Sequence, residues 1–227
     1  DHAGNGITVK DIHDRLFPAL QTLSAKCWTG AATSFSFEDF NRLRLALSEA
    51  PAVNEAARWQ KGKQLRIETL NPGQTTGEKE VGYGYRVEFT IEGADEPKGT
   101  VLFSSDNATF YLADPESGQL GFAREGYLNK FNYRVEKGKK VTLAITGDNR
   151  KTCLYVDGKL REELGPVTLY AMLPKDLATF QKSDATATQP IVYNPSAKMH
   201  YQRTLVFPLQ KTGDFKSWIT GVKVEQE

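Results

Sequence analysis

Apolar and polar residues alternate along the segment YGYRVEFTIE, which runs from Tyr83 to Glu92. Tyr85, Val87 and Phe89 fall on one side of this alternation, and the polar residues between them fall on the other. Successive side chains of a β-strand point to opposite faces, so a period of two predicts a strand with one buried face.

Further short apolar runs follow this segment, and turn-forming sequences such as DPESG, EKGKK and GDNRK separate them. The runs are TVLFSS, TFYLAD, QLGFAR, KVTLAITG, TCLYVDG, VTLYAM, RTLVFPLQ and WITGVKVE. Many short strands joined by tight turns predict a mainly β protein, an antiparallel β-sandwich or jelly roll.

The first 60 residues have a helical period instead. Thr8 to Asp11 fits the capping-box pattern T-x-x-D, which marks the start of a helix. Pro18 predicts either a kink in this helix or a second helix that begins at the proline. The apolar stripe of the segment consists of Ile12, Leu16, Leu20, Leu23 and Cys27.

A second amphipathic helix is predicted between the capping pattern at Ser36 to Asp39 and the stop at Pro51. Its apolar stripe consists of Phe40, Leu43 and Leu47. Two helices cannot fully cover two apolar faces by packing on each other, so we expect a further partner for them.

The change of period predicts two parts. We expect residues 1–60 to form a helical segment and residues 61–227 to form the sandwich, with a loop insertion near 174–200. In that insertion the alternation gives way to Ala, Thr, Ser, Asn and Pro, which is typical of a surface segment.

Composition narrows the function classes. A formal charge of +1, from 29 basic and 28 acidic residues, gives no electrostatic drive toward nucleic acid or an anionic membrane. No apolar run approaches the roughly 18 residues that a membrane-spanning helix needs. Cys27 and Cys153 are the two cysteines, and we expect two free, mostly buried thiols.

Candidate chemistry is sparse. Asp95 and Glu96 form an adjacent carboxylate pair, but the surrounding GADEPKG is typical of an exposed turn, where nothing shifts a carboxyl pKa. The three histidines, His2, His13 and His200, have no neighbours at metal-ligand spacing. GDNRK could offer oxygens to calcium, but a hairpin turn is favoured. We therefore expect no catalytic residue, metal or cofactor in this chain.

Aromatic residues number 24 in all, and such rings can stack on sugars as well as fill a core. Tyr127, Phe131 and Tyr133 in EGYLNKFNYR lie in a stretch that alternates poorly, which favours a crossover loop. They are candidate sugar-binding residues, although core packing is the favoured interpretation.

The β-rich part resembles a concanavalin-like or laminin-G-like jelly roll. The resemblance rests on VTLAITGDNRKTCLYVDGKL, in which the turn at Asp157 and Gly158 closes a hairpin, and on the late strand TGVKVE. In that family the motif is structural and ligand binding belongs to variable loops, so the resemblance concerns the fold more than the ligand.

The helical part, DRLFPALQTLSAKCWTG followed by SFEDFNRLRLAL, is similar to the end of the catalytic barrel of glycoside hydrolase family 20, the β-N-acetylhexosaminidases. The matching residues are Pro18, Leu20, Leu23, Ala25 and Trp28, whereas Ala19 stands where that family commonly has Arg. The resemblance implies that the two to three predicted helices are the tail of a truncated (β/α)8 barrel.

A barrel tail followed by a jelly roll resembles the multidomain hexosaminidases with which gut-type bacteria degrade host glycans. It implies an exported, periplasmic or cell-surface parent enzyme that acts on glycans containing N-acetylglucosamine or N-acetylgalactosamine. The family's Trp-x-Glu loop implies that Asp1 stands where a carboxylate contacts substrate hydroxyls. The family's catalytic Asp-Glu pair has no counterpart here, so this chain is expected to be an inactive accessory region.

Two other functions stay open at this point. The jelly roll could be a carbohydrate-binding module that holds glycan near the parent's active site. Alternatively, the chain could be a non-catalytic adhesion protein of the laminin-G type, which predicts that the helices pack on the sandwich and leave no apolar face exposed.

Overall fold

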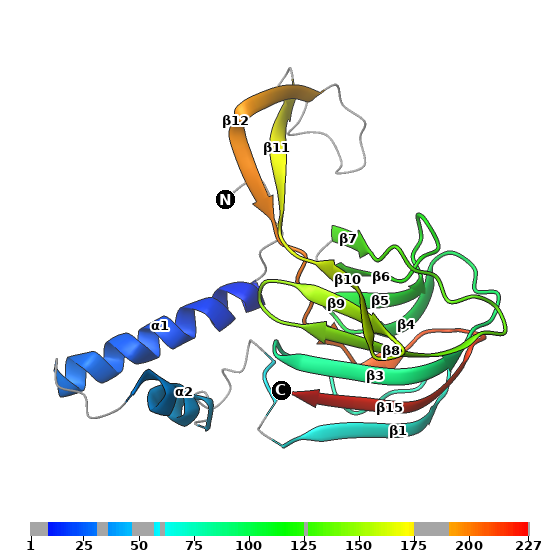
Figure 1. The fold of residues 1–227 in the computed structure, drawn as a ribbon, viewed down its shortest axis with the longest axis horizontal. Helices are drawn as coiled ribbons and strands as arrows, with labels where there is room; N and C mark the ends of the chain where they lie inside the picture. Colours follow the sequence, from blue (N-terminus) through cyan, green and yellow to red (C-terminus); the bar gives the residue numbers. More distant parts are fainter. Residues whose placement is uncertain are drawn as a thin grey trace.

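The computed structural model describes residues 9–30, 36–46, 57–59, 62–124, 127–174 and 191–226, with the backbone alone for 10, 44–46, 167–174 and 191–201. Within these residues two helices precede the strands: α1 spans Val9–Thr29 and α2 spans Phe37–Ala46. Figure 1 shows both helices beside a two-layered β-sandwich, from which a narrow two-stranded ribbon projects.

The first layer is a six-stranded antiparallel sheet with the order β1-β15-β3-β8-β9-β10. The strands are β1 Gln64–Leu70, β15 Trp218–Gln226, β3 Tyr85–Glu92, β8 Lys140–Gly147, β9 Thr152–Val156 and β10 Lys159–Leu164. The last strand of the chain therefore lies between two early ones, and antiparallel neighbours throughout are typical of a sandwich.

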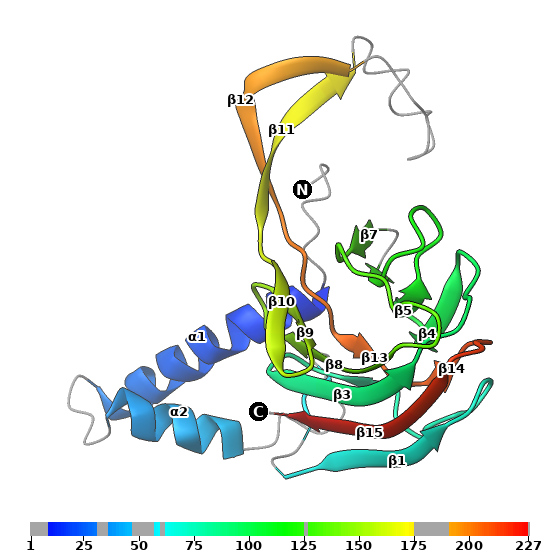
Figure 2. The same cartoon turned by 45° about the vertical axis from the view of Figure 1, so that its right-hand side comes forward.

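The second layer is a five-stranded sheet with the order β14-β4-β5-β6-β7, and a short pair, β13-β2, lies beside it. Its strands are β14 Lys211–Thr212, β4 Thr100–Ser104, β5 Ala108–Ala113, β6 Gly121–Arg124 and β7 Tyr127–Lys130. The short pair joins β13 Phe207–Pro208 to β2 Glu80–Val81. Figure 2 shows the two layers facing each other.

The alternation of the sequence decides which residues fill the space between the layers. Along β3 the burial pattern alternates strictly, with Tyr85, Val87 and Phe89 buried and the residues between them half-buried. Phe207 lies between the sheets, its ring centroid 5.2 Å from that of Phe110 and 5.8 Å from that of Phe103. The prediction of a mainly β, antiparallel sandwich of jelly-roll type is confirmed.

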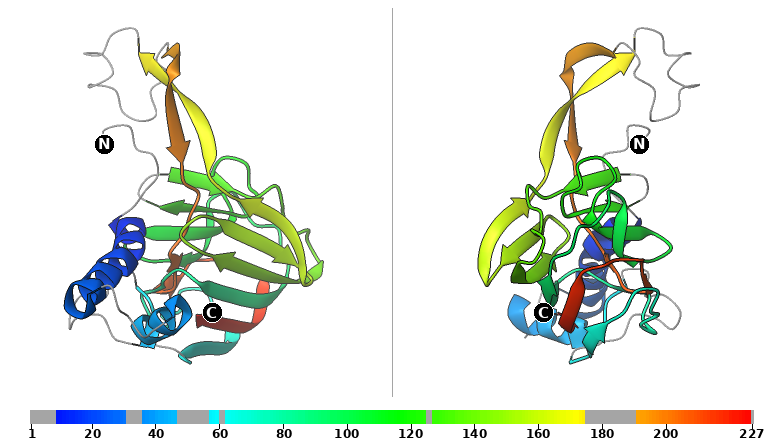
Figure 3. Two further views of the ribbon diagram at one scale, coloured as in Figure 1. Left: turned by 60° about the vertical axis from the view of Figure 1, so that its left-hand side comes forward. Right: turned by 90° about the vertical axis from the view of Figure 1, so that its right-hand side faces the viewer.

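Several strands were not predicted. The stretch taken for a crossover loop contains β7, and β1 precedes the first predicted strand. The expected loop insertion is partly regular: β11, Val167–Pro174, pairs with β12, Ile191–Tyr201, as an antiparallel ribbon. The ribbon projects from the edge of the sandwich where β10 ends (Figure 3). Residues 175–190 lie outside the described part of the chain, and the division into parts at residue 60 stays a prediction.

The helix predictions are refined in two places. Pro18 lies inside α1, which runs through it as one helix. Ser36 caps α2, because its Oγ accepts the backbone N–H of Asp39 at 3.1 Å. Both cysteines are free, but only Cys153 is buried; Cys27 on α1 is exposed, contrary to the expectation of mostly buried thiols.

The DPESG turn is organised by one carboxylate. Asp114 is fully buried, and its Oδ1 accepts the backbone N–H groups of Glu116 and Ser117, each at 2.8 Å. Its Oδ2 accepts the N–H of Gln119 at 3.0 Å and the hydroxyl of Ser117. Burial raises the pKa of Asp114, but these hydrogen bonds outweigh it and hold the pKa below its ordinary value of 3.8.

Asp114→Asn is expected to lower the free energy of unfolding by about 1–3 kcal/mol at neutral pH, because the charged acceptor is lost. A carboxyl whose folded-state pKa is lowered stabilises the protein above its unfolded-state pKa and ceases to do so as the pH falls through the folded-state value. Urea denaturation should therefore show a gap between wild type and variant at about pH 7 that narrows as the pH falls below 3.8 and closes once the carboxyl is protonated in the folded protein. A gap that persists in acid would contradict this role.

Candidate functional site

Helix α1 is held to the sandwich through a buried polar cluster near its start. Asp11 is fully buried; its Oδ1 accepts the hydroxyls of Tyr83 at 2.5 Å and Thr204 at 2.9 Å. Its Oδ2 lies 3.7 Å from Nη1 of Arg124, whose side chain is 4% exposed. Burial and the Asp11 carboxylate raise the pKa of Tyr83 well above its usual value, which keeps the hydroxyl a donor.

The next turn of α1 continues this attachment at the surface. Asp14 pairs with Arg58 at 2.7 Å and accepts the side-chain amide of Asn149 at 2.6 Å. Arg15 donates from Nη2 to the backbone carbonyl of Asn149 at 2.5 Å and, at 3.4 Å, to Oε1 of Gln202. Side chains from two turns of α1 thus fix the helix to five separate segments of the chain, at residues 58, 83, 124, 149 and 202–204.

The opposite side of α1 is apolar and uncovered. At about 100° per residue, Asp11, Asp14 and Pro18 lie on the helix side opposite Leu16 and Leu20. The apolar stripe predicted for this helix is exposed, and Val9 extends it at the start. Val9, Ile12, Leu16, Leu20 and Leu23 are 46 to 59% exposed, and Cys27 is exposed as well.

Near the end of α1, Trp28 is 88% exposed, and on α2 Phe37 and Leu43 are exposed as well. The laminin-G alternative predicts that the helices leave no apolar face exposed, whereas in the structure the apolar stripe of α1 is exposed.

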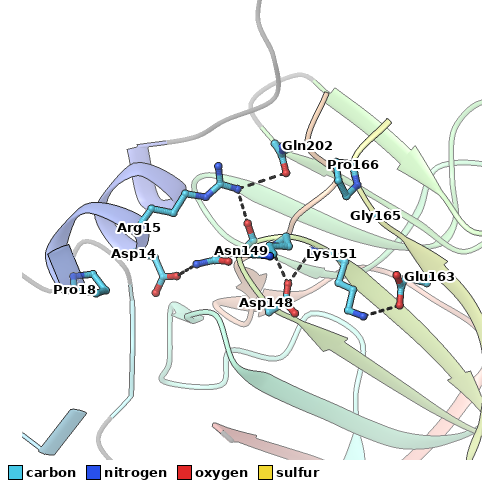
Figure 4. Close-up of a pocket in the computed structure, with 11 residues that line it drawn as sticks. Asp14, Arg15, Pro18, Asp148, Asn149, Lys151, Glu163, Gly165, Pro166 and Gln202 are labelled. Atoms are coloured by element: carbon cyan, nitrogen blue, oxygen red, sulfur yellow. Dashed lines mark hydrogen bonds and ion pairs between the residues drawn. The ribbon is translucent and has the colours of Figure 1, made fainter. Parts of the chain in front are cut away.

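A cleft of about 740 Å³ lies between α1 and the edge of the sandwich (Figure 4). Four segments line it: the start of α1, the turn between β8 and β9, the end of β10 with the residues after it, and the residue after β12. The lining residues are Asp14, Arg15, Pro18, Asp148, Asn149, Arg150, Lys151, Glu163, Gly165, Pro166 and Gln202.

The turn at one side of this cleft is fixed by its own hydrogen bonds. Oδ1 of Asp148 accepts the backbone N–H groups of Arg150 at 2.7 Å and Lys151 at 2.8 Å, which closes an Asx turn. Lys151 pairs with Glu163 at 2.7 Å. This hydrogen bond and charge raise the pKa of Lys151, and the hydrogen bond from Lys151 lowers the pKa of Glu163.

No protein-family model matches the chain, and no curated protein matches its sequence. Solved structures are similar in fold. Domain 4 of the extracellular arabinanase AbnA of Geobacillus stearothermophilus, solved with arabinotriose, is 12% identical with a TM-score of 0.34 over 71% of this chain. The Caenorhabditis elegans galectin LEC-6 is 9% identical with a TM-score of 0.39 over 70% of this chain.

The sialidase of Trypanosoma rangeli is 14% identical, with a TM-score of 0.34 over 75% of this chain. The chain spans 65% of the arabinanase domain, 95% of the galectin and 26% of the sialidase. At these identities and TM-scores the similarities carry no argument about ligand or activity.

The sugar-binding candidates lie in different surroundings. Phe131 is fully buried, its ring 6.1 Å from that of Phe122, so core packing accounts for it. Tyr127 and Tyr133 are half-buried, and burial raises the pKa of Tyr133, which packs against the core. A sugar-binding role for these two stays a prediction. Asp1 lies outside the described residues.

The other candidate groups have structural roles. Oε1 of Glu96 accepts the backbone N–H of Lys216 at 2.8 Å and both the N–H and the hydroxyl of Ser217 at 2.7 Å, so this residue braces two loops. His13 packs edge to face on Phe17. Within the described residues, no group of three or more His, Cys, Asp or Glu could hold a metal ion. No described helix is long and apolar enough to cross a membrane.

Sequence reasoning missed the residues that position α1 and line the cleft. The sequence marks Asp11 only as part of a capping box, because its partners Tyr83, Arg124 and Thr204 are 72 to 193 residues away along the chain. Nothing in the sequence distinguishes Arg15 or Arg150 from the other basic residues of the chain. The exposed stripe, in contrast, was visible in the helical period.

Proposed function

We propose that this chain is the C-terminal accessory region of an exported β-N-acetylhexosaminidase of glycoside hydrolase family 20. In this proposal α1 and α2 are the last helices of the catalytic barrel, and the sandwich braces that barrel from outside. The parent acts on glycans that contain N-acetylglucosamine or N-acetylgalactosamine, outside the cytoplasm, and this chain alone is inactive.

The observation that carries the proposal is the exposed apolar stripe of α1. Burial of each large aliphatic side chain contributes about 1.5–3 kcal/mol, so a covered stripe of five such residues would stabilise an interface strongly. Trp28 adds a large aromatic surface, the kind of residue that dominates interface energetics. An apolar face of this size indicates a partner.

A barrel is the partner that fits both sides of the helix. The outer helices of a (β/α)8 barrel turn their apolar side toward the strands. In α1 the apolar stripe faces away from the sandwich, while Asp11, Asp14 and Arg15 hold the sandwich through polar contacts. A helix with one apolar and one anchored side suits a position between a barrel and an accessory domain.

The test is hydrolysis of a chromogenic β-N-acetylglucosaminide by this chain and by the full polypeptide that its gene encodes. We expect the full polypeptide to turn the substrate over and this chain to be inactive. Activity in this chain alone would overturn the accessory role, because it would require a catalytic site here. Inactivity of both would overturn the family assignment.

A further inference from the structure

Two cations line the cleft between α1 and the sandwich, Arg15 and Arg150, and neither has an acidic partner within the part of the chain that the structure describes. We propose that it binds a sugar that carries an acidic group, either a carboxylate or a sulfate, and that Arg15 and Arg150 pair with this group. This cleft is separate from the proposed barrel contact of α1, and the accessory role does not require that the cleft bind a ligand.

Two of the three acidic residues that line the cleft are already neutralised. Both oxygens of Asp14 are occupied, Oδ1 by Arg58 and Oδ2 by Asn149. Glu163 is paired with Lys151 at 2.7 Å. The opposite charges within each pair cancel, so the net charge of the cleft depends on its remaining residues.

The remaining charges favour an anion. Nη2 of Arg15 bonds to two neutral oxygens, a backbone carbonyl and an amide, which leaves Nε and Nη1 as donors. Arg150 is exposed, and among the residues that the structure describes its guanidinium has no acidic partner. Guanidinium groups bind carboxylate and sulfate-like oxyanions through paired hydrogen bonds. Among the lining residues that the structure describes, Asp148 is the one carboxylate left to oppose these two cations.

The other lining groups suit sugar hydroxyls. Oδ1 of Asp148 accepts the hydrogen bonds of the turn, so its Oδ2 remains as an acceptor for a ligand. Nδ2 of Asn149 donates to Asp14, so the side-chain oxygen of Asn149 remains as a second acceptor. Gln202 accepts from Arg15 and has its amide N–H groups as donors. Pro18 and Pro166 provide apolar surface for the C–H groups of a sugar ring.

A nucleotide would also bring an anion, but it fits less well. Nucleobases are usually held by stacking on aromatic side chains. The lining residues that the structure describes include no aromatic ring. A volume of about 740 Å³ lies within the usual range of small-ligand sites, roughly 300–1,000 Å³.

The site and the proposed barrel contact can coexist. The cleft lies on the side of α1 that faces the sandwich, whereas the apolar stripe lies on the opposite side. Covering the stripe would therefore leave the residues of the cleft in place. The binding experiment uses this chain alone, so its outcome is separate from that of the hydrolysis test.

The experiment is calorimetric titration of the chain at low salt with methyl β-glucuronide and with N-acetylglucosamine 6-sulfate. The neutral controls are methyl β-glucoside and N-acetylglucosamine. We expect at least one acidic sugar to bind with a Kd on the order of 1 mM or tighter. Its neutral counterpart should bind at least tenfold more weakly, and the sugar that binds identifies the carboxylate or the sulfate as the ligand group.

Arg150→Gln is expected to weaken binding tenfold or more, and Arg15→Gln should do the same. Arg150 lies in an exposed turn, so its variant tests the site even if Arg15→Gln loosens α1. Arg161→Gln is the matched control, because Arg161 is exposed on β10 but does not line the cleft.

Three results would overturn the proposal: no binding of either acidic sugar, equal binding of acidic and neutral sugars, or binding that Arg150→Gln leaves unchanged. Inorganic sulfate is titrated as well. If it binds as tightly as the sulfated sugar, the cleft holds a simple anion and the sugar assignment is wrong.

Discussion

Asp11→Ala is expected to release α1 from the sandwich while the sandwich itself stays folded. The variant leaves the guanidinium of Arg124 buried without its charge partner, and loss of one partner of a buried ion pair costs about 3–5 kcal/mol. Detachment of α1 relieves that cost, because water then reaches Arg124. The remaining contacts of Asp14 and Arg15 are at the surface and hold the helix weakly.

Hydrogen exchange of backbone amides measures this release. In the variant the amides of α1 should exchange at least 100-fold faster, the change expected for about 3 kcal/mol of lost anchoring, while β3 and β8 keep their protection. Asp39→Ala removes an exposed ion pair with Arg42 on α2 and should leave the exchange of α1 unchanged.

A double variant separates lost charge from lost packing. Asp11→Leu with Arg124→Met removes both charges of the pair, so neither is left buried without the other, and much of the protection of α1 should return. Unchanged exchange of α1 in Asp11→Ala would show that the buried cluster does not hold the helix. No recovery in the double variant would show that the hydroxyls of Tyr83 and Thr204, rather than the charge pair, need the Asp11 carboxylate.

The sequence predicts the sandwich well because the sandwich depends on a local rule. A strand with one buried face must alternate, and β3 alternates in both sequence and burial. The rule is weaker at β7, where Asn129 takes an inward, buried position between Tyr127 and Phe131 and so hides the period. The alternation rule also fails to predict β12, because this strand pairs with β11 in the ribbon and belongs to neither layer of the sandwich.

The attachment of α1 could not be predicted from the sequence, for a different reason. A buried charge such as Arg124 looks like a surface residue until the fold brings Asp11 to it, and no periodicity marks such a pair. The same holds for the cleft, whose residues come from four segments. The helical period does predict the apolar stripe. It does not predict whether the sandwich covers the stripe, because that depends on how α1 packs on the sandwich.

The double substitution Leu16→Glu with Leu20→Glu is expected to be nearly neutral in this chain and strongly destabilising in the full polypeptide. In this chain both side chains are exposed, so the free energy of unfolding should change by no more than about 0.5 kcal/mol. In the full polypeptide the same residues would be buried against the barrel. Lost burial of two leucines and two unpaired charges at that contact should then cost about 4 kcal/mol or more.

Chemical denaturation of both proteins, each with and without the substitutions, measures this contrast. Ser24→Glu on the same helix adds a charge at an exposed polar position and should be neutral in both settings. A large loss of stability in this chain would mean that the stripe is already covered here. A buried apolar face cannot accept two carboxylates without a cost in stability. Neutrality in both proteins would therefore mean that the stripe contacts no barrel, and the accessory role would lose the observation that carries it.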